Sequence, residues 1–218
     1  MQSLTEAVYH LNPPGGLFDQ TVVLNLFPDR SVGARKLLIN RALQYGEIIR
    51  LRHRLYCLEQ RFRRSHPHPF MIAAAIHGPS HVSLESALAY HGLIPEAVYQ
   101  VANVTTMRSR EFRNPMGHFA YYRVLSTTPR AGVKAIELSR QEWAFVATPI
   151  RAIVDIVYLR KIDWRKNGIA FLTESMRIEE DELASLDFTF LDEIMSGIQN
   201  YRVFEYMKNM TREIRRQC

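Results

Sequence analysis

Between residues 1 and 60 the spacing of apolar residues changes once, and the change separates predicted helices from predicted strands. Apolar side chains recur at helical spacing over residues 3–10, 18–27 and 31–45. Ser31 is a suitable N-cap for the third helix, and Gly46 stands where a left-handed residue commonly ends a helix. The sequence therefore predicts three helices, of which the third is the longest.

After this third helix the apolar positions alternate, as they do in a strand. Ile49 and Leu51 alternate with Arg50 and Arg52, and a second apolar run over residues 55–58 follows a short turn. This pattern predicts a β-hairpin whose tip and outer positions are basic.

Residues 61–69 (RFRRSHPHP) are polar and interrupted by proline, which predicts a linker. We therefore expect two domains with a boundary near His66, one over residues 1–65 and the other over residues 66–218.

The pattern beyond the linker predicts a mixed second domain. Helices are expected over residues 70–76, 83–91 and 149–160, with Ser83 as an N-cap and a turn at residues 78–80. Strands are expected over residues 98–106, 110–113, 118–125, 134–139 and 142–147. The expected fold class is thus α+β, with a small antiparallel sheet in this domain.

The last part of the chain predicts a helical tail. Helical spacing continues over residues 179–186, 191–198 and 200–216. From residue 171 onward the chain carries ten acidic and six basic residues, so this tail is acidic.

Composition narrows the class of protein. The 218 residues contain no apolar run near the roughly 20 residues that a membrane span needs, and the first residues do not resemble a secretion signal. Cys57 and Cys218 lack metal-ligand spacing and form no disulfide framework. We therefore expect a cytoplasmic protein with no metal, no cofactor and no membrane partner.

The positive charge is concentrated in one segment. Residues 30–64 carry ten Arg and Lys against Glu47 and Glu59, a net charge of +8, whereas the whole chain carries +6. Nine of the ten are arginine, whose forked guanidinium suits phosphate and guanine. Composition alone leaves an ordinary solvated basic face as an equal alternative to a surface for a polyanion.

Placed on the predicted elements, this charge indicates a winged helix that binds DNA. Such a module lays one helix in the major groove while a two-stranded wing touches the backbone or the minor groove. Arg35, Lys36 and Asn40 are the preferred groove residues, and the wing arginines are assigned to phosphate or the minor groove. The candidate DNA-binding residues are Arg30, Arg35, Lys36, Asn40, Arg41, Arg50, Arg52 and Arg54.

Five segments together resemble a known family. They are SVGARKLLINRALQYGEIIRLRHRLYCL, VSLESALAYHGLI, VTTMRSREF, HFAYYRV and ATPIRAIVDIVYL, and in order and spacing they extend over most of the chain. The sequence resembles AbiEi-type proteins, the antitoxin and transcriptional-regulator half of type IV toxin-antitoxin systems.

The resemblance implies a winged-helix domain that binds repeats in its own promoter and represses its operon. It also implies a second domain that counters a nucleotidyltransferase-like toxin, usually without a stable complex. Within the family-like motifs of that domain, Glu85, Arg151 and Asp155 are candidates for a regulatory surface. Arg151 and Asp155 are four residues apart, so an ion pair along one helix face is the favoured structural role.

One position departs from the family pattern. The wing turn of the family commonly carries a glycine before the final Leu-Tyr, and Arg54 stands there in this chain. We therefore expect that a residue with positive φ is missing and that the turn is of another type.

The sequence gives little support to catalysis. Ser83, His91 and Asp155 would make an imaginable triad, but Ser83 stands at a helix start and no nucleophile elbow is present. His66 and His68 have no Cys or carboxylate close by in sequence to complete a metal site. Two alternatives to the antitoxin remain, a stand-alone regulator that senses a protein or ligand and, less favoured, a nucleic-acid-processing enzyme.

Overall fold

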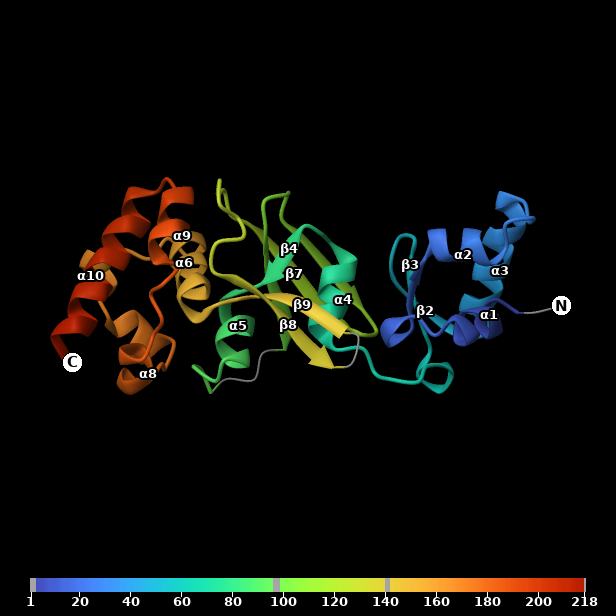
Figure 1. Cartoon of the computed structure of the whole chain (residues 1–218), viewed down its shortest axis with the longest axis horizontal. Coiled ribbons are helices and arrows are strands. Elements are labelled where there is room, and N and C mark those ends of the chain that lie inside the picture. The colour runs from blue at the N-terminus through green and yellow to red at the C-terminus, as the bar shows by residue number, and fades with distance from the viewer. Residues whose placement is uncertain (1–2, 96–98, 140–141, 218) are drawn as a thin grey trace.

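In the computed structural model the chain forms an elongated molecule with three parts in a row (Figure 1). The structure describes residues 3–95, 99–139 and 142–217. Of Gln217 only the backbone is described. The first helices and strands lie at one end, a larger sheet occupies the middle, and the C-terminal helices form the other end.

The N-terminal part combines three helices with a three-stranded antiparallel sheet. The helices are α1 (Leu4–Leu11), α2 (Gln20–Leu26) and α3 (Val32–Gln44), and the strands are β1 (Leu17–Asp19), β2 (Ile48–Arg52) and β3 (Leu55–Leu58). β3 lies between β1 and β2, and all four of its residues are buried. Its uninterrupted apolar run suits a strand that is covered on both faces.

The single helix expected over residues 18–27 is wrong at its start. Leu17 pairs with Cys57 and Phe18 with Tyr56, so this segment begins as strand β1. The Asp19 side chain then accepts hydrogen bonds from the backbone N–H groups of Thr21 and Val22, which starts α2 at Gln20. Helical spacing misled here because the partner strand is about 40 residues away in sequence.

The middle part is built on a six-stranded mixed sheet, and the small antiparallel sheet expected from the sequence is therefore wrong. The strands are β4 (Ser80–Val82), β5 (Gln100–Thr105), β6 (Arg110–Asn114), β7 (Gly117–Arg123), β8 (Val133–Ser139) and β9 (Glu142–Ala147). Their order is β6-β7-β5-β4-β9-β8, and the pairs β5–β7 and β4–β9 are parallel. Val98, expected in the first of these strands, lies outside the described residues.

Strand β4 was missed because its first residue belongs to the expected turn at residues 78–80. Three residues are too few to show a period, and β4 gains its hydrogen bonds from β5 and β9, which follow it by roughly 20 and 60 residues.

Helices cover both faces of this sheet. In β7, Tyr121 packs with Ile72 and Ala73 of α4 (Pro69–Ile76), whereas its neighbour Tyr122 packs against the core that includes α5 (Leu84–Tyr90) and α6 (Pro149–Leu159). Because successive residues of a strand point to opposite faces, α4 lies on one face and α5 with α6 on the other.

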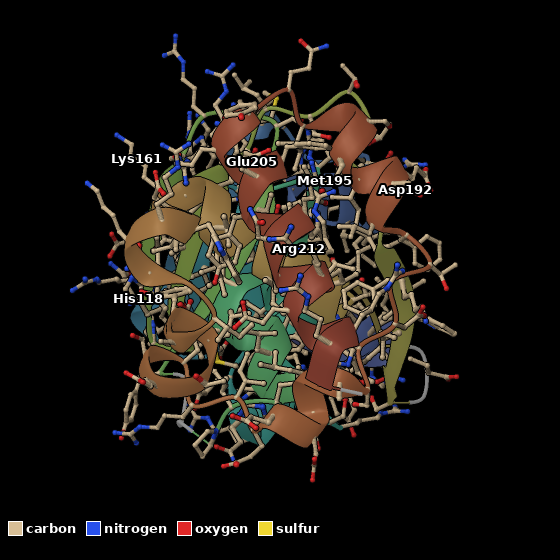
Figure 2. All side chains as sticks on the ribbon, turned by 90° about the vertical axis from the view of Figure 1, so that its left-hand side faces the viewer. His118, Lys161, Asp192, Met195, Glu205 and Arg212 are labelled. Atoms are coloured by element: carbon tan, nitrogen blue, oxygen red, sulfur yellow. The ribbon has the colours of Figure 1, made fainter. Side chains whose placement is uncertain are left out.

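The C-terminal part is helical, as expected, and packs against α6. It contains a π-helical turn over Phe171–Ser175 and the helices α7 (Trp164–Asn167), α8 (Glu180–Ala184), α9 (Leu191–Gly197) and α10 (Tyr201–Gln217). Arg202 of α10 donates hydrogen bonds to the carbonyl oxygens of Val157, Tyr158 and Ile162, at 2.7 to 3.2 Å. Val157 and Tyr158 lie in the last turn of α6, where carbonyl oxygens lack a partner within the helix, and Ile162 lies in the segment that follows it. Figure 2 looks onto this end of the molecule and shows Glu205 and Arg212 along α10, with Asp192 and Met195 on α9.

The segment expected to be a linker is packed rather than loose. Pro67 is buried, and the His68 side chain caps α4 by accepting a hydrogen bond from the backbone N–H of Phe70 at 3.1 Å. Leu51, Leu55 and Cys57 of the β2–β3 hairpin share one apolar cluster with α4 and β7. The division at residues 65 and 66 stays a prediction, but the hairpin is fixed to the middle part.

Candidate nucleic-acid interface

Helix α3 is held at both ends by local hydrogen bonds. The Ser31 side chain accepts a hydrogen bond from the Ala34 N–H at 3.2 Å, which confirms it as the N-cap. At the other end the Gly46 N–H donates to the Leu43 carbonyl and the Glu47 N–H to the Ala42 carbonyl, with Gly46 at a φ of 61°. This pair of bonds is the Schellman arrangement, so the helix ends where the sequence predicts.

One face of α3 is free for a partner. Ile39 and Ala42 are buried in the N-terminal core, whereas Lys36, Asn40 and Arg41 are exposed. Helical spacing places three further exposed or small positions on the same outer face. These positions are Gly33, Leu37 and Gln44.

Leu37 and Gln44 were not among the candidates derived from the sequence. The candidates were chosen for charge and amide groups near the helix start. Once Ile39 and Ala42 are taken as the inner face, a 3.6-residue period adds both residues to the outer face.

Two of the candidate DNA-binding residues, one of them a preferred groove residue, instead contact the loop before α3. The Arg35 Nη1 donates hydrogen bonds to the carbonyl oxygens of Phe27, Pro28 and Arg30, at distances of 3.2, 3.4 and 2.5 Å. The Arg30 guanidinium lies over the Phe27 ring, 5.4 Å from its centroid. Both side chains are half-buried and hold the α2–α3 connection, and their assignment to DNA stays a prediction.

The β2–β3 hairpin presents three arginines to solvent. Arg50, Arg52 and Arg54 are exposed, and the Arg52 Nη1 donates to the His53 carbonyl at the tip at 3.0 Å. The expectation that the turn lacks a positive-φ residue is wrong, because Arg54 itself adopts a φ of 64°. A residue other than glycine or asparagine that adopts this left-handed backbone conformation costs about 1 kcal/mol of conformational free energy.

The hairpin is bonded to β6 and packed against the middle part of the molecule. Asn114 of β6 donates a hydrogen bond from Nδ2 to the Leu51 carbonyl at 3.2 Å, and Cys57 is fully buried beneath the strands. Burial raises the pKa of the Cys57 thiol, an effect that the neighbouring Arg63 opposes. The exposed arginines of the hairpin therefore extend from strands that are packed against the rest of the protein.

Exposed basic residues are also found at the six-stranded sheet, outside the basic segment that the sequence singled out. Arg108 and Arg110, at the start of β6, are exposed. The pKa of His77 is lowered by burial first, and the charges of Arg110 and Arg52 lower it further. Arg110 and Arg52 thus both lie near His77, although more than 50 residues separate them in sequence.

The arginines beyond the hairpin contact the protein itself. Arg63 donates to Cys57 Sγ at 3.2 Å, Arg61 lies over the Phe62 ring at 4.7 Å, and Arg64 lies over the Tyr9 ring at 5.1 Å. These contacts agree with leaving the three residues out of the recognition set.

Two of the three regulatory-surface candidates, Arg151 and Asp155, form a buried ion pair instead of a surface. Arg151 Nε donates to both carboxylate oxygens of Asp155, at 3.0 and 3.1 Å, which confirms the pair expected from the spacing. The two residues are 1% and 0% exposed, so the expectation of a regulatory surface is wrong for them. Glu85 is more accessible and forms an ion pair with Arg160.

Asp155 is kept ionised by its surroundings. Burial alone would raise its pKa, but the charge of Arg151 and the approach of His81 outweigh burial, so the pKa lies below the usual value. The Ser83 hydroxyl donates to Asp155 Oδ2 at 2.7 Å, and His81 Nε2 lies 3.6 Å from the same oxygen. Sequence reasoning missed His81 because only the parallel pairing of β4 with β9 brings it near α6.

This arrangement does not make a nucleophilic triad. Ser83 bonds directly to the carboxylate, with no histidine between them, and its side chain does not cap α5. His91 lies against the Ala147 carbonyl, with Nε2 at 2.9 Å. Within the described residues Ser83 is therefore not bonded to a histidine that would serve as the base of a triad.

Within residues 3–95, 99–139 and 142–217, no three His, Cys, Asp or Glu side chains are grouped as a metal site. No helix in these ranges has the length and apolar character to span a membrane. Cys218 lies outside the described residues.

No protein-family model and no curated protein matches this chain. The exposed basic groups of α3 and the hairpin, together with the motifs in the sequence, are the features that bear on function.

Proposed function

We propose that the N-terminal part is a winged helix-turn-helix that binds double-stranded DNA. In this assignment α2 and α3 form the helix-turn-helix, α3 enters the major groove, and the β2–β3 hairpin is the wing. The observation that carries the proposal is the exposure of Lys36, Asn40 and Arg41 on one face of α3, next in sequence to a hairpin with three exposed arginines.

The side chains on these two elements suit different parts of DNA. Asn40 has the donor and acceptor pair that matches adenine in the major groove, and Arg41 can pair with guanine. Arg50, Arg52 and Arg54 are assigned to phosphates, where each neutralised charge releases counterions. Arg30 and Arg35 contribute by fixing the angle between α2 and α3.

In the cell we propose that the protein represses its own operon and acts as a type IV antitoxin. The resemblance to AbiEi-type sequences supports this role, with repeats in its promoter as the DNA partner and a nucleotidyltransferase-like toxin as the functional partner. The protein would act by binding and not by catalysis, and Ser83, bonded to Asp155, fits that view.

A stand-alone regulator with a ligand-sensing second domain is the other candidate. It is favoured by a pocket of about 170 Å³ beside Arg151 in the middle part. A neighbouring gene for a nucleotidyltransferase-like protein, and rescue from its toxicity by this chain, would distinguish the antitoxin from the stand-alone regulator.

Fluorescence anisotropy with a labelled duplex from the protein's own promoter tests the DNA assignment. The triple variant Lys36→Ala, Arg50→Ala, Arg52→Ala should bind at least about tenfold more weakly, because three phosphate or base contacts are lost. The matched control Arg165→Ala, Lys166→Ala, Lys208→Ala removes three exposed charges from α7 and α10, at the far end of the molecule (Figure 1). Equal affinity of the triple variant and the wild type would exclude α3 and the wing as the DNA surface.

A further inference from the structure

We infer that the middle part holds a binding site for a small organic anion with a ring-sized apolar body. The site is the pocket between the β4, β5 and β9 strands, the start of α6 and the loop before β8. It is lined by Pro79, Ser80, His81, Val104, Thr105, Thr106, Val124, Pro129, Arg130, Val133, Phe145 and Arg151.

The charge of the lining selects an anion. Arg130 is exposed at the pocket and Arg151 is buried in its wall, whereas no Asp or Glu is found among the described residues that line it. Asp155 pairs with Arg151 and also lies 3.6 Å from His81 Nε2, but it is not paired with Arg130 among the described residues. The pocket therefore has an excess of positive charge that a carboxylate would balance.

Arg151 is held ready to bind. Its Nε is occupied by Asp155, and its Nη1 donates to the Ala131 carbonyl at 3.1 Å. Within the described chain no acceptor is bonded to Nη2, so one end of the guanidinium remains for a ligand. Because Asp155 and Ala131 already fix the side chain, little conformational entropy is lost on binding.

His81 provides a second buried polar group at the pocket. It is 8% exposed, and its Nε2 has no hydrogen-bond partner in the described part of the chain, since Asp155 Oδ2 at 3.6 Å is too distant. The contact with Asp155 is thus a long ion pair without a hydrogen bond, and a ligand oxygen closer to Nε2 would supply the missing hydrogen bond.

The volume of the pocket and its apolar lining indicate the uncharged part of the ligand. Val104, Val124, Val133 and Phe145 supply the apolar lining, and Phe145 is 57% exposed although it is aromatic. A volume of about 170 Å³ is close to that of an engineered cavity of about 150 Å³ that binds benzene. The ligand class is thus a monocarboxylate on a flat ring, and benzoate is the simplest probe.

Calorimetric titration of the full chain with benzoate, in the absence of DNA, tests the site. We expect saturable binding with a Kd of about 1 mM or tighter. Benzamide, which lacks the charge, and acetate, which lacks the ring, should each bind at least about tenfold more weakly. Absence of benzoate binding, or equal affinity for either analogue, would overturn the assignment.

Two variants locate the binding. Thr106→Trp places a large side chain at a half-exposed position of the lining and should abolish binding, and Arg130→Gln should weaken it about fivefold. Arg165→Gln on α7 is the control of equal charge change and should bind as the wild type does. Unchanged affinity in a folded Thr106→Trp variant, checked by circular dichroism, would place benzoate elsewhere. The site does not depend on the proposed DNA function, so either proposal can fail alone.

Discussion

The arginine side chains of this protein differ in what their guanidinium groups contact. Arg35 and Arg202 donate to backbone carbonyl oxygens inside the molecule, whereas Arg41 and Arg50 are exposed. An arginine that satisfies buried carbonyls contributes to stability, and an exposed arginine contributes little to it. Substitutions at the two kinds of position should therefore give different results.

Replacement of Arg35 tests its role in the loop before α3. In Arg35→Ala the carbonyl oxygens of Phe27, Pro28 and Arg30 lose their shared donor. The free energy of unfolding should fall by about 1 to 2 kcal/mol in urea titrations. Arg41→Ala is the matched control, with a change within about 0.5 kcal/mol. Equal losses in both variants would contradict the assigned role.

In the turn of the hairpin a substitution is expected to stabilise the fold. Arg54 has a φ of 64°, a conformation that glycine adopts without steric cost. Arg54→Gly should raise the free energy of unfolding by about 1 kcal/mol, measured in the same titration. Arg50→Gly, inside strand β2 where Arg50 pairs with Tyr56, should lower it instead. A destabilised Arg54→Gly variant would show that the turn conformation is not strained.

Asp155 gives the protein a predicted pH dependence. Its pKa is lowered in the folded state, so it stabilises the fold above the unfolded-state pKa of about 3.9, and this contribution is lost as the pH falls through the folded pKa. Asp155→Asn should be destabilised by about 3 to 5 kcal/mol at neutral pH, because it leaves the Arg151 charge buried without a counter-ion. The difference from the wild type should narrow below about pH 4.

Urea unfolding at several pH values measures this effect. Asp192→Asn, an exposed change on α9, is the control and should follow the wild type. A difference between Asp155→Asn and the wild type that stays constant with pH would show that ionised Asp155 is not the stabilising species.

At the scale of elements, α3 and the hairpin are positioned by different forces. Local hydrogen bonds set the ends of α3, at Ser31 and Gly46. The hairpin is positioned by packing, since Leu51 and Leu55 belong to a cluster completed by α4 and β7. The two elements should therefore contribute differently to binding specificity and to salt dependence.

Single substitutions can separate these contributions if the DNA proposal holds. Asn40→Ala should weaken binding to the promoter repeat by about 1 to 3 kcal/mol while leaving a scrambled duplex unaffected. Arg50→Ala should weaken both duplexes and reduce the slope of log affinity against log salt by about 1. Anisotropy titrations at several salt concentrations measure both effects, with Lys208→Ala as the control. The reverse pattern would exchange the roles of helix and wing.

At the scale of the whole molecule, the cluster around Cys57 joins the N-terminal part to the sheet. Cys57 is fully buried, with Ile72 and Ala73 of α4 in the same cluster. A movement of the wing would have to disturb this packing. We expect the hairpin and α4 to behave as one rigid unit.

The reactivity of Cys57 reports on this packing. In a Cys218→Ser background, Cys57 should react slowly with a thiol reagent, because it is buried and its pKa is raised. A chain cut to residues 1–65 lacks α4 and β7, so its Cys57 should react about tenfold faster or more. Leu125→Ala, at an exposed position outside the cluster, is the control in the full chain. Equal rates in the fragment and the full chain would mean that the cluster does not protect the hairpin.

Local patterns in the sequence determined α3, the hairpin, α4 and α6, because caps, periodicity and turns act over a few residues. They also identified the Arg151–Asp155 pair, since positions four apart in a helix are neighbours. The concentration of basic residues in one segment identified most of the residues of the candidate interface. Which of its side chains are exposed was not determined, as Arg35 illustrates.

Only the tertiary structure decided the features that depend on distant segments. Strands β1 and β4 exist because distant strands bond to them, and the mixed order of the sheet follows from those pairings. The packing of distant segments also brings His81 to Asp155 and buries Arg151. It likewise places Arg110 and Arg52 near His77. No short window of sequence contains such contacts, because they are set by the packing of the whole chain.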